Sequence, residues 1–101
     1  MTLRVGINGF GRIGRMVARA MALRQNEFEI VGINDVGPPP KIHAHLFKYD
    51  SSYGIYPGTV EVDGKDLVVD GKKIQIFSER DPGNIPWAEL GVEIVIESTG
   101  V

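Results

Sequence analysis

The sequence predicts an α/β fold, specifically a doubly wound parallel sheet of which the chain carries about the first half. Two observations predict it. An apolar run, a segment of helical period and a second apolar run follow one another between Leu3 and Asn34. A glycine pattern of the form G-x-G-x-x-G joins the first apolar run to the helical segment. Together these features are typical of a strand–helix–strand unit that binds a nucleotide.

The first unit consists of a strand over Leu3 to Asn8, a helix over Arg12 to Arg24 and a strand over Phe28 to Asn34. Apolar residues recur at helical spacing in the middle segment, namely Ile13, Met16, Val17, Ala20 and Met21. We expect the two strands to be parallel, with a right-handed crossover between them.

Each glycine of the motif has a physical reason. Gly9 lets the chain turn sharply off the strand, Gly11 leaves room for a pyrophosphate against the main chain, and Gly14 lets the helix pack close to the strand. The helix N-terminus then directs free N–H groups at the phosphates. The motif therefore predicts a Rossmann-type dinucleotide site, and the alternative is a tight strand–helix turn without a ligand.

An acidic residue follows the second strand, as such a site requires. Asp35 lies at its carboxyl end, where a carboxylate accepts hydrogen bonds from the adenosine ribose hydroxyls. The same carboxylate would repel a 2′-phosphate, which favours NAD over NADP. The alternative for Asp35 is a turn-forming residue after Asn34.

The rest of the chain predicts shorter elements. Val36 to Pro40 is a strong breaker because three consecutive prolines lack backbone donors. Two Asp-Gly turns between short β-rich runs predict a small antiparallel β-meander from Thr59 to Phe77. The remaining expected elements are a helix over Lys41 to Lys48, a turn over Tyr49 to Gly54, a helical piece over Ile85 to Leu90 with Trp87 and Leu90 facing inward, and a last strand over Val92 to Glu97.

Composition excludes several classes of function. The 101 residues carry 11 basic and 13 acidic side chains, so no electrostatic footprint for nucleic acid or an anionic membrane is present. The absence of cysteine excludes disulfides, thiolate metal sites and a cysteine nucleophile within the chain. His43 and His45 would point about 200° apart on a helix, so no metal site is expected. Met1 to Arg4 lacks the shape of a signal peptide, which predicts a cytoplasmic location.

Several blocks go beyond a generic nucleotide fingerprint. They are Asn8 to Arg15, Asn34-Asp35, Leu46 to Ser51, Asp70 to Lys72, Arg80 to Pro82, Pro86-Trp87 and Glu97 to Gly100. With these blocks in this order, the chain closely resembles the N-terminal part of the phosphorylating glyceraldehyde-3-phosphate dehydrogenase family over essentially its whole length. The unusually rigid Gly37 to Pro40 segment departs from that resemblance.

The resemblance implies a cytoplasmic homotetramer that uses NAD and inorganic phosphate to oxidise glyceraldehyde 3-phosphate to 1,3-bisphosphoglycerate in glycolysis. It implies that the backbone at Arg12 and Ile13 holds the pyrophosphate, that Asp35 holds the ribose and that Arg80 contacts the adenine region. Phe10 would line the adenine side of the pocket. The full set of expected cofactor-binding residues is Asn8, Gly9, Phe10, Gly11, Arg12, Ile13, Gly14, Asp35, Arg80, Thr99 and Gly100.

The resemblance also implies that the catalytic cysteine, its histidine partner and the phosphate-binding residues lie beyond Val101. We therefore expect residues 1–101 to form an incomplete NAD-binding domain that lacks the catalytic domain, contains no catalytic residue and is inactive alone. Two other interpretations stay open, namely an erythrose-4-phosphate dehydrogenase and a nucleotide-binding module without redox activity.

Overall fold

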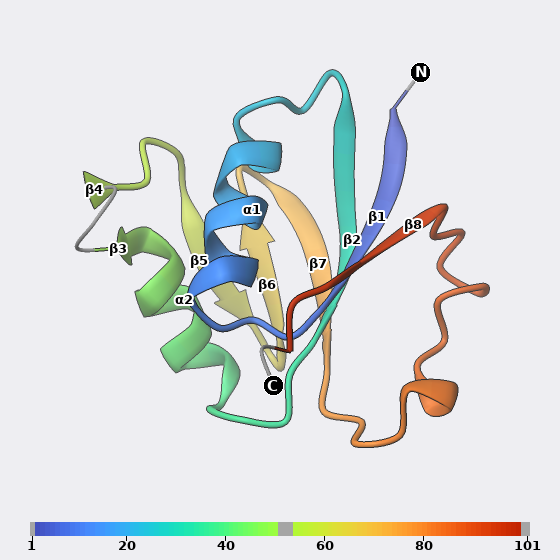
Figure 1. The fold of residues 1–101 in the computed structure, drawn as a ribbon. Helices are drawn as coiled ribbons and strands as arrows, with labels where there is room; N and C mark the ends of the chain where they lie inside the picture. Colours follow the sequence, from blue (N-terminus) through green and yellow to red (C-terminus); the bar gives the residue numbers. More distant parts are fainter. Residues whose placement is uncertain (1, 51–53, 100–101) are drawn as a thin grey trace.

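A six-stranded sheet with two helices packed on one of its faces forms the described part of the chain (Figure 1). The structure is a computed structural model, and it describes residues 2–50 and 54–99. The sheet has the order β5-β6-β7-β2-β1-β8. Its strands are β1 (Leu3–Asn8), β2 (Phe28–Asn34), β5 (Val60–Asp63), β6 (Asp66–Val69), β7 (Lys72–Phe77) and β8 (Ile94–Glu97).

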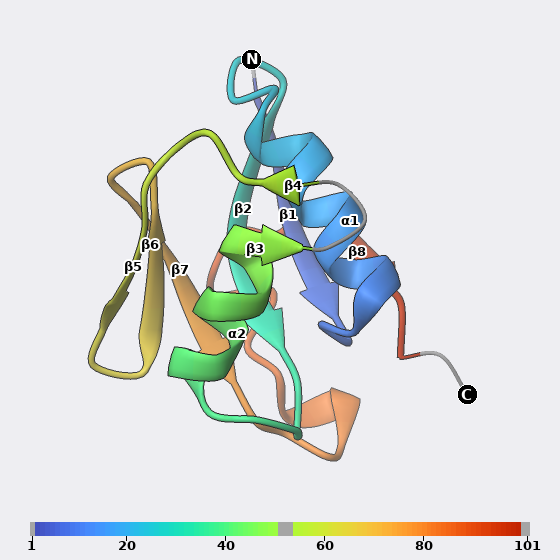
Figure 2. The same cartoon turned by 90° about the vertical axis from the view of Figure 1, so that its left-hand side faces the viewer.

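The centre of the sheet is parallel, as predicted. β1 pairs in parallel with β2 on one side and with β8 on the other, and β2 pairs in parallel with β7. Helices α1 (Arg12–Ala22) and α2 (Pro40–Lys48) lie on the same side of the sheet (Figure 2). This order of elements confirms the Rossmann-type fold class.

The meander is confirmed, but it is part of the main sheet. β5 pairs antiparallel with β6, and β6 pairs antiparallel with β7. Asp70 and Gly71 both have positive φ, 53° and 80°, as the predicted two-residue turn between β6 and β7 requires. Because β7 also pairs in parallel with β2, the meander extends the nucleotide-binding sheet instead of standing apart from it.

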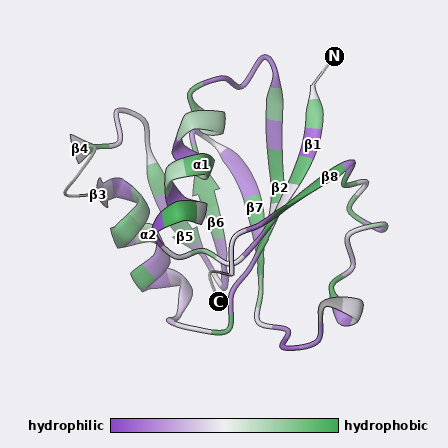
Figure 3. Cartoon of the chain, viewed as in Figure 1, coloured by the Kyte–Doolittle hydropathy of each residue, from purple (hydrophilic) through white to green (hydrophobic). Residues whose placement is uncertain are grey.

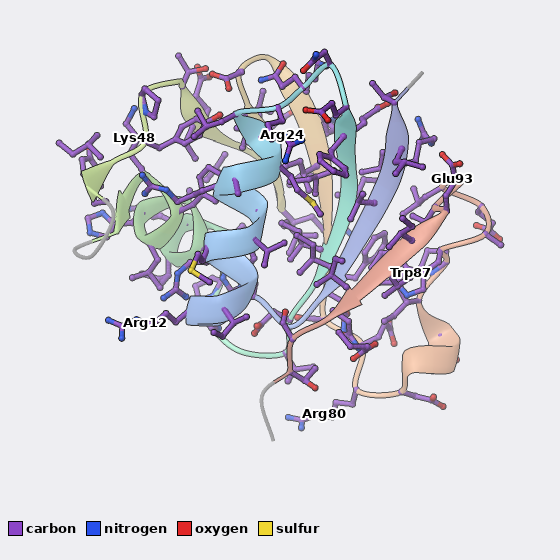
Figure 4. All side chains as sticks on the ribbon, turned by 45° about the horizontal axis from the view of Figure 1, so that its top comes forward. Arg12, Arg24, Lys48, Arg80, Trp87 and Glu93 are labelled. Carbon is purple, nitrogen blue, oxygen red and sulfur yellow. The ribbon has the colours of Figure 1, made fainter. Side chains whose placement is uncertain are left out.

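Opposite faces of β1 are covered by different parts of the chain. Val5 and Ile7 are fully buried in the core against the helices. Gly6 points to the other face, where a Cβ would lie 2.5 Å from the ring of Trp87. Figure 4 shows Trp87 beside the sheet on that side, and a Cβ at Gly32 would meet Leu90 at 3.1 Å. The predicted inward orientation of Trp87 and Leu90 is therefore confirmed.

Several boundaries differ from the prediction. The first helix ends at Ala22, and the last strand begins only at Ile94. Ile85 to Leu90 forms turns and not a helix, because its backbone bonds span different intervals, such as Trp87 N–H to Ile85 O, Leu90 N–H to Pro86 O and Val92 N–H to Trp87 O. A short 3₁₀ turn at Pro82–Asn84 precedes this segment.

A two-stranded sheet was not predicted. β3 (Tyr49–Asp50) pairs antiparallel with β4 (Gly54–Ile55), within the segment where the sequence predicted only a turn. Residues 51–53 of the predicted turn, among them Ser51 of the family-like block, lie outside the described residues.

The three prolines start the second helix one residue earlier than predicted. Pro39 is the N-cap in an extended conformation, with φ −67° and ψ 163°, and Pro40 occupies the first helical turn. Proline is favourable there because its missing N–H would have no helical partner. The rigid segment thus fixes where α2 begins.

The hydropathy pattern follows this architecture. Strands β1, β2 and β8 carry hydrophobic stretches, whereas the loop after β7 is largely hydrophilic (Figure 3). Within the described residues, no helix has the length and apolar character needed to cross a membrane.

Replacing Gly6 with valine tests the packing of Trp87. The new side chain would occupy space that the indole now fills, so we expect the free energy of unfolding to fall by about 1–3 kcal/mol. The measurement is urea unfolding followed by circular dichroism. Gly11→Ala is the control, because a Cβ at Gly11 meets nothing within 4 Å. An unchanged unfolding midpoint for Gly6→Val would show that Trp87 does not pack on β1 in solution.

Candidate cofactor site

An open pocket of ≈ 550 Å³ lies at the edge of the sheet where β1, β2 and β8 end. Ligands of open α/β sheets bind outside the carboxyl ends of the strands, so this is the expected position. Ten residues line the pocket: Asn8, Gly9, Asn34, Asp35, Val36, Gly37, Glu79, Arg80, Glu97 and Thr99. Five of them belong to the predicted cofactor-binding set, namely Asn8, Gly9, Asp35, Arg80 and Thr99.

The glycine turn is packed closely at two positions and open at the third. Gly9 has φ +98°, and a Cβ there would lie 2.6 Å from the backbone of Ser98. A Cβ at Gly14 would lie 2.2 Å from the carbonyl oxygen of Gly9. Gly11, by contrast, has open space where a Cβ would be. The turn therefore has a free approach to its main chain at Gly11, which is the position that the motif assigns to the pyrophosphate.

Helix α1 begins at this turn without a capping side chain. Gly11 is its N-cap residue, and the first turn contains no acidic residue. Arg12 and Ile13 are exposed, Ile13 by 58%, and Figure 4 shows Arg12 projecting outward at the start of the helix. Uncapped N–H groups and the positive end of the helix dipole favour an anion at this point.

Asp35 connects the glycine turn to the loop that follows β2. Its Oδ2 accepts a hydrogen bond from the Phe10 N–H at 2.7 Å, and its Oδ1 accepts one from the Gly37 N–H at 2.7 Å. A carboxylate has about four lone-pair sites, so acceptor capacity remains on the side that faces the pocket. Asp35 and the glycine turn, which the sequence analysis assigned separately to the cofactor, are thus in direct contact.

Phe10 does not line the pocket with its side chain. The ring is 1% exposed and packs against His43 and Phe47 in the core, at centroid distances of 5.4 and 6.1 Å. Only the backbone of Phe10 takes part in the site, through its N–H to Asp35 and its carbonyl, which accepts from Arg15 Nη1 at 3.1 Å. The sequence shows that an aromatic residue stands in the turn, but not which way it faces.

A row of polar side chains crosses the strand ends, and the sequence analysis assigned only one of them, Asn8, to the cofactor site. Asn34 donates through Nδ2 to Asn8 Oδ1 at 2.9 Å, and Asn8 donates through Nδ2 to both carboxylate oxygens of Glu97, at 3.0 and 3.2 Å. Asn34 also bonds the backbone of Glu79. One signal was available in the sequence, because Asn34 and Glu97 end buried-type strands of a predicted parallel sheet.

Other expected residues take different positions. Arg80 and Thr99 are exposed and line the pocket from opposite segments, one after β7 and one after β8. Figure 4 shows Arg80 at the same end of the molecule as Arg12. Gly100 lies outside the described residues.

His43 lies behind the turn, where it is 1% exposed and packs against Phe10. Its two ring nitrogens have no hydrogen-bond partner among the described residues. Burial lowers the pKa of His43, while Asp35 raises this pKa and Arg15 lowers it further. Within the described residues, no group of three His, Cys, Asp or Glu side chains is arranged to hold a metal ion.

Comparison with known proteins now adds to this geometry. Residues 3–101 match the family model described as the glyceraldehyde 3-phosphate dehydrogenase, NAD binding domain. The chain belongs to this family. NAD is accordingly its cofactor, as predicted.

Proteins named glyceraldehyde-3-phosphate dehydrogenase match the whole chain. Identity is 54% to one from Ogataea parapolymorpha, 52% to one from Neurospora crassa and 57% to a cytosolic one from Trypanosoma brucei brucei, over 101 residues in each case. The chain spans 30% of the length of these relatives.

The buried His43 predicts a pH dependence of stability. Because its pKa is lower in the folded chain than the usual 6.5, the unfolded chain binds more protons in the interval between the two values. The contribution of the neutral His43 to the free energy of unfolding is therefore fully present above about pH 6.5, and it is lost as the pH falls toward the folded pKa. We expect His43→Leu to be less sensitive than the wild type between pH 7 and 5 in thermal unfolding.

His45→Gln provides the matched control, since His45 lies on the same helix but is exposed. It should retain the pH response of the wild type. Equal pH responses in the wild type and His43→Leu would show that His43 is not buried in a neutral form.

Proposed function

We propose that this chain supplies the adenosine and pyrophosphate half of the NAD site in a glyceraldehyde-3-phosphate dehydrogenase. The whole enzyme would convert glyceraldehyde 3-phosphate, NAD and inorganic phosphate to 1,3-bisphosphoglycerate and NADH. The observation that carries this proposal is the hydrogen bond from the Phe10 N–H to Asp35. It joins the carboxylate that would bind the ribose, which lines the pocket, to the glycine turn. Whole-chain identity to relatives of that name supports it.

The pyrophosphate would bind at the start of α1. The backbone N–H groups of Arg12 and Ile13 would hold its oxygens, and the open position at Gly11 would let the phosphates approach the main chain. Gly9 and Gly14 would act indirectly, because each is needed for close packing and not for contact with the ligand.

The adenosine would lie across the ends of β2 and β7. Asp35 would accept hydrogen bonds from the ribose hydroxyls, and the adenine would lie near Arg80. Thr99 would contact the cofactor from the other side of the pocket. Gly100 belongs to the proposed set through the family resemblance alone, and Asn8 would act through its bonds to Glu97 and Asn34.

Catalysis would depend on residues outside this chain. The chain contains no cysteine, and covalent oxidation of an aldehyde in this way needs a thiolate to form a hemithioacetal. β8 lies at the edge of the sheet with Ile94 and Val95 exposed by 41% and 37%, which suits the addition of further parallel strands there. On this proposal, the nicotinamide half of the site and the catalytic domain belong to the remainder of the enzyme.

Oligomeric state and location are part of the same proposal. We expect a homotetramer, as the family resemblance implies, and a cytoplasmic location, in keeping with the relative from Trypanosoma brucei brucei that is named cytosolic. An erythrose-4-phosphate dehydrogenase would share the adenosine half described above, and a module without redox activity would bind nucleotide but produce no NADH.

Gly11→Val tests the phosphate role of the turn. A branched side chain at Gly11, the open glycine of the motif, would occupy the path of the pyrophosphate, so NAD affinity should fall at least tenfold, about 1.4 kcal/mol. The fold should change little, since the space at Gly11 is free. The measurement is calorimetric titration with NAD, together with a circular dichroism spectrum of the variant. Unchanged affinity would remove the phosphates from this turn.

Asp35→Ala tests cofactor choice. The substitution removes the ribose acceptors and the repulsion of a 2′-phosphate, so the ratio of NAD to NADP affinity should drop at least tenfold. Glu61→Ala is the control, because Glu61 is an exposed carboxylate on β5 outside the pocket. A wild-type protein that binds NADP as well as NAD would contradict the assignment of Asp35.

A further inference from the structure

The side chain of Asn34 takes the place of a strand partner for a loop residue. Its Nδ2 donates to the carbonyl of Glu79 at 3.0 Å, and its Oδ1 accepts from the N–H of the same residue at 2.8 Å. The backbone pairing of β2 with β7 ends at Asn34 and Phe77. The amide therefore extends the pairing beyond the end of the strand, to the residue that directly precedes Arg80.

The side-chain amide of Asn34 is fixed in one orientation by its hydrogen bonds. Both hydrogens of Nδ2 are used, one for Glu79 and one for Asn8 Oδ1, while Oδ1 accepts from Glu79. Asn34 is 4% exposed and Asn8 6%, so a lost bond would leave a buried polar group without a partner. Asn8 in turn donates to Glu97, next to the segment that carries Thr99. This row of bonds connects the two sides of the pocket.

Arg80 depends on this anchoring. No hydrogen bond or ion pair to another described residue holds the exposed guanidinium of Arg80, so the backbone of its loop is what keeps this side chain beside the pocket that it lines. A second bond holds the same loop, from Ser78 Oγ to the carbonyl of Asp35 at 3.0 Å. The loop that carries Arg80 is thus fixed against the residue that would bind the ribose.

We propose that Asn34 is a positioning residue for nucleotide binding, which acts by fixing the backbone at Glu79 and so directing Arg80 at the adenine region. This inference rests on the proposed function, in which Arg80 contacts the adenine. A purely structural role for Asn34 is less economical, because two of its three side-chain bonds go to Glu79, a loop residue whose own side chain is exposed and contributes nothing to the core. The part of NAD that would bind here consists of an adenosine and two phosphates, so ADP is its simplest probe.

The experiment compares two substitutions at Glu79. Glu79→Pro removes the Glu79 side chain together with the backbone N–H that donates to Asn34 Oδ1. Glu79→Ala removes the side chain but keeps this N–H. Because the Glu79 side chain is exposed, neither change removes a side chain from the core. ADP is titrated calorimetrically into both variants, first with Arg80 present and then in the Arg80→Ala background. Asn34→Ala, measured on both backgrounds, gives a second route to the same comparison, and thermal unfolding confirms that each variant is folded.

We expect the proline variant to bind ADP at least fivefold more weakly than the alanine variant when Arg80 is present. In the Arg80→Ala background the two should bind equally, because an effect that acts through Arg80 is not additive with its loss. A difference that persists without Arg80 would overturn the inference, since Asn34 would then act on the fold in general.

Two further outcomes separate this inference from the proposed function. If Arg80→Ala weakens ADP binding and the two Glu79 variants do not differ, the positioning role is wrong and the proposed site stands. If Arg80→Ala binds ADP as the wild type does, Arg80 has no part in the adenosine site, and the positioning role fails together with that assignment.

Discussion

The close contact between the β1–α1 turn and the end of β8 is the constraint on which the site depends. Ser98 Oγ donates to the carbonyl of Gly9 at 2.6 Å. A Cβ on Gly9 would clash with the backbone of Ser98, and a Cβ on Gly14 would clash with the carbonyl oxygen of Gly9. Three elements therefore meet where no side chain fits. Any substitution that separates them would move the helix start away from the strand ends, and the pocket lies between those two features.

Most of the charged side chains that line the pocket are acidic. Asp35, Glu79 and Glu97 place carboxylates around its strand side, and Arg80 is the basic residue among those that line it. Such a wall would repel a pyrophosphate but suits ribose hydroxyls, which donate hydrogen bonds. The phosphates are then favoured at the start of α1, where uncapped N–H groups and the exposed Arg12 lie. In the proposed site, this distribution of charge would place the ribose at the strand ends and the phosphates at the helix start.

The sequence predicted those parts of the fold that depend on local backbone geometry. The glycine spacing, Asp35 at the end of a strand and the Asp-Gly turns all carry steric requirements that residues next to each other in the chain reveal. The parallel pairing of β7 with β2 was not predicted, because alternation in the meander fixes which face is buried but not which neighbour the last strand takes. Ile85 to Leu90 has the spacing of a helix, yet Trp87 packs on two glycines of the sheet and the backbone bonds here span different intervals.

For the site, the sequence identified positions better than it identified side-chain directions. Phe10 was expected to line the adenine side of the pocket, but its ring faces the core. Asn34 was assigned only as the end of a strand, because its bonds to Glu79 join residues that are 45 positions apart. Contacts over such separations depend on how the strands are ordered in the sheet, and a single sequence does not show that order directly.

Phe10 shows how the core of this domain prepares the site for its ligand. Its ring is held by His43 and Phe47, its N–H by Asp35 and its carbonyl by Arg15. A turn fixed at its side chain and at both backbone groups has little conformational freedom left to lose when a ligand binds. Because ordering a loop on binding costs free energy, such a turn favours affinity. Phe10 is therefore part of both the core and the site. A smaller residue at Phe10 would make both the Asp35 carboxylate and the glycine turn less firmly held.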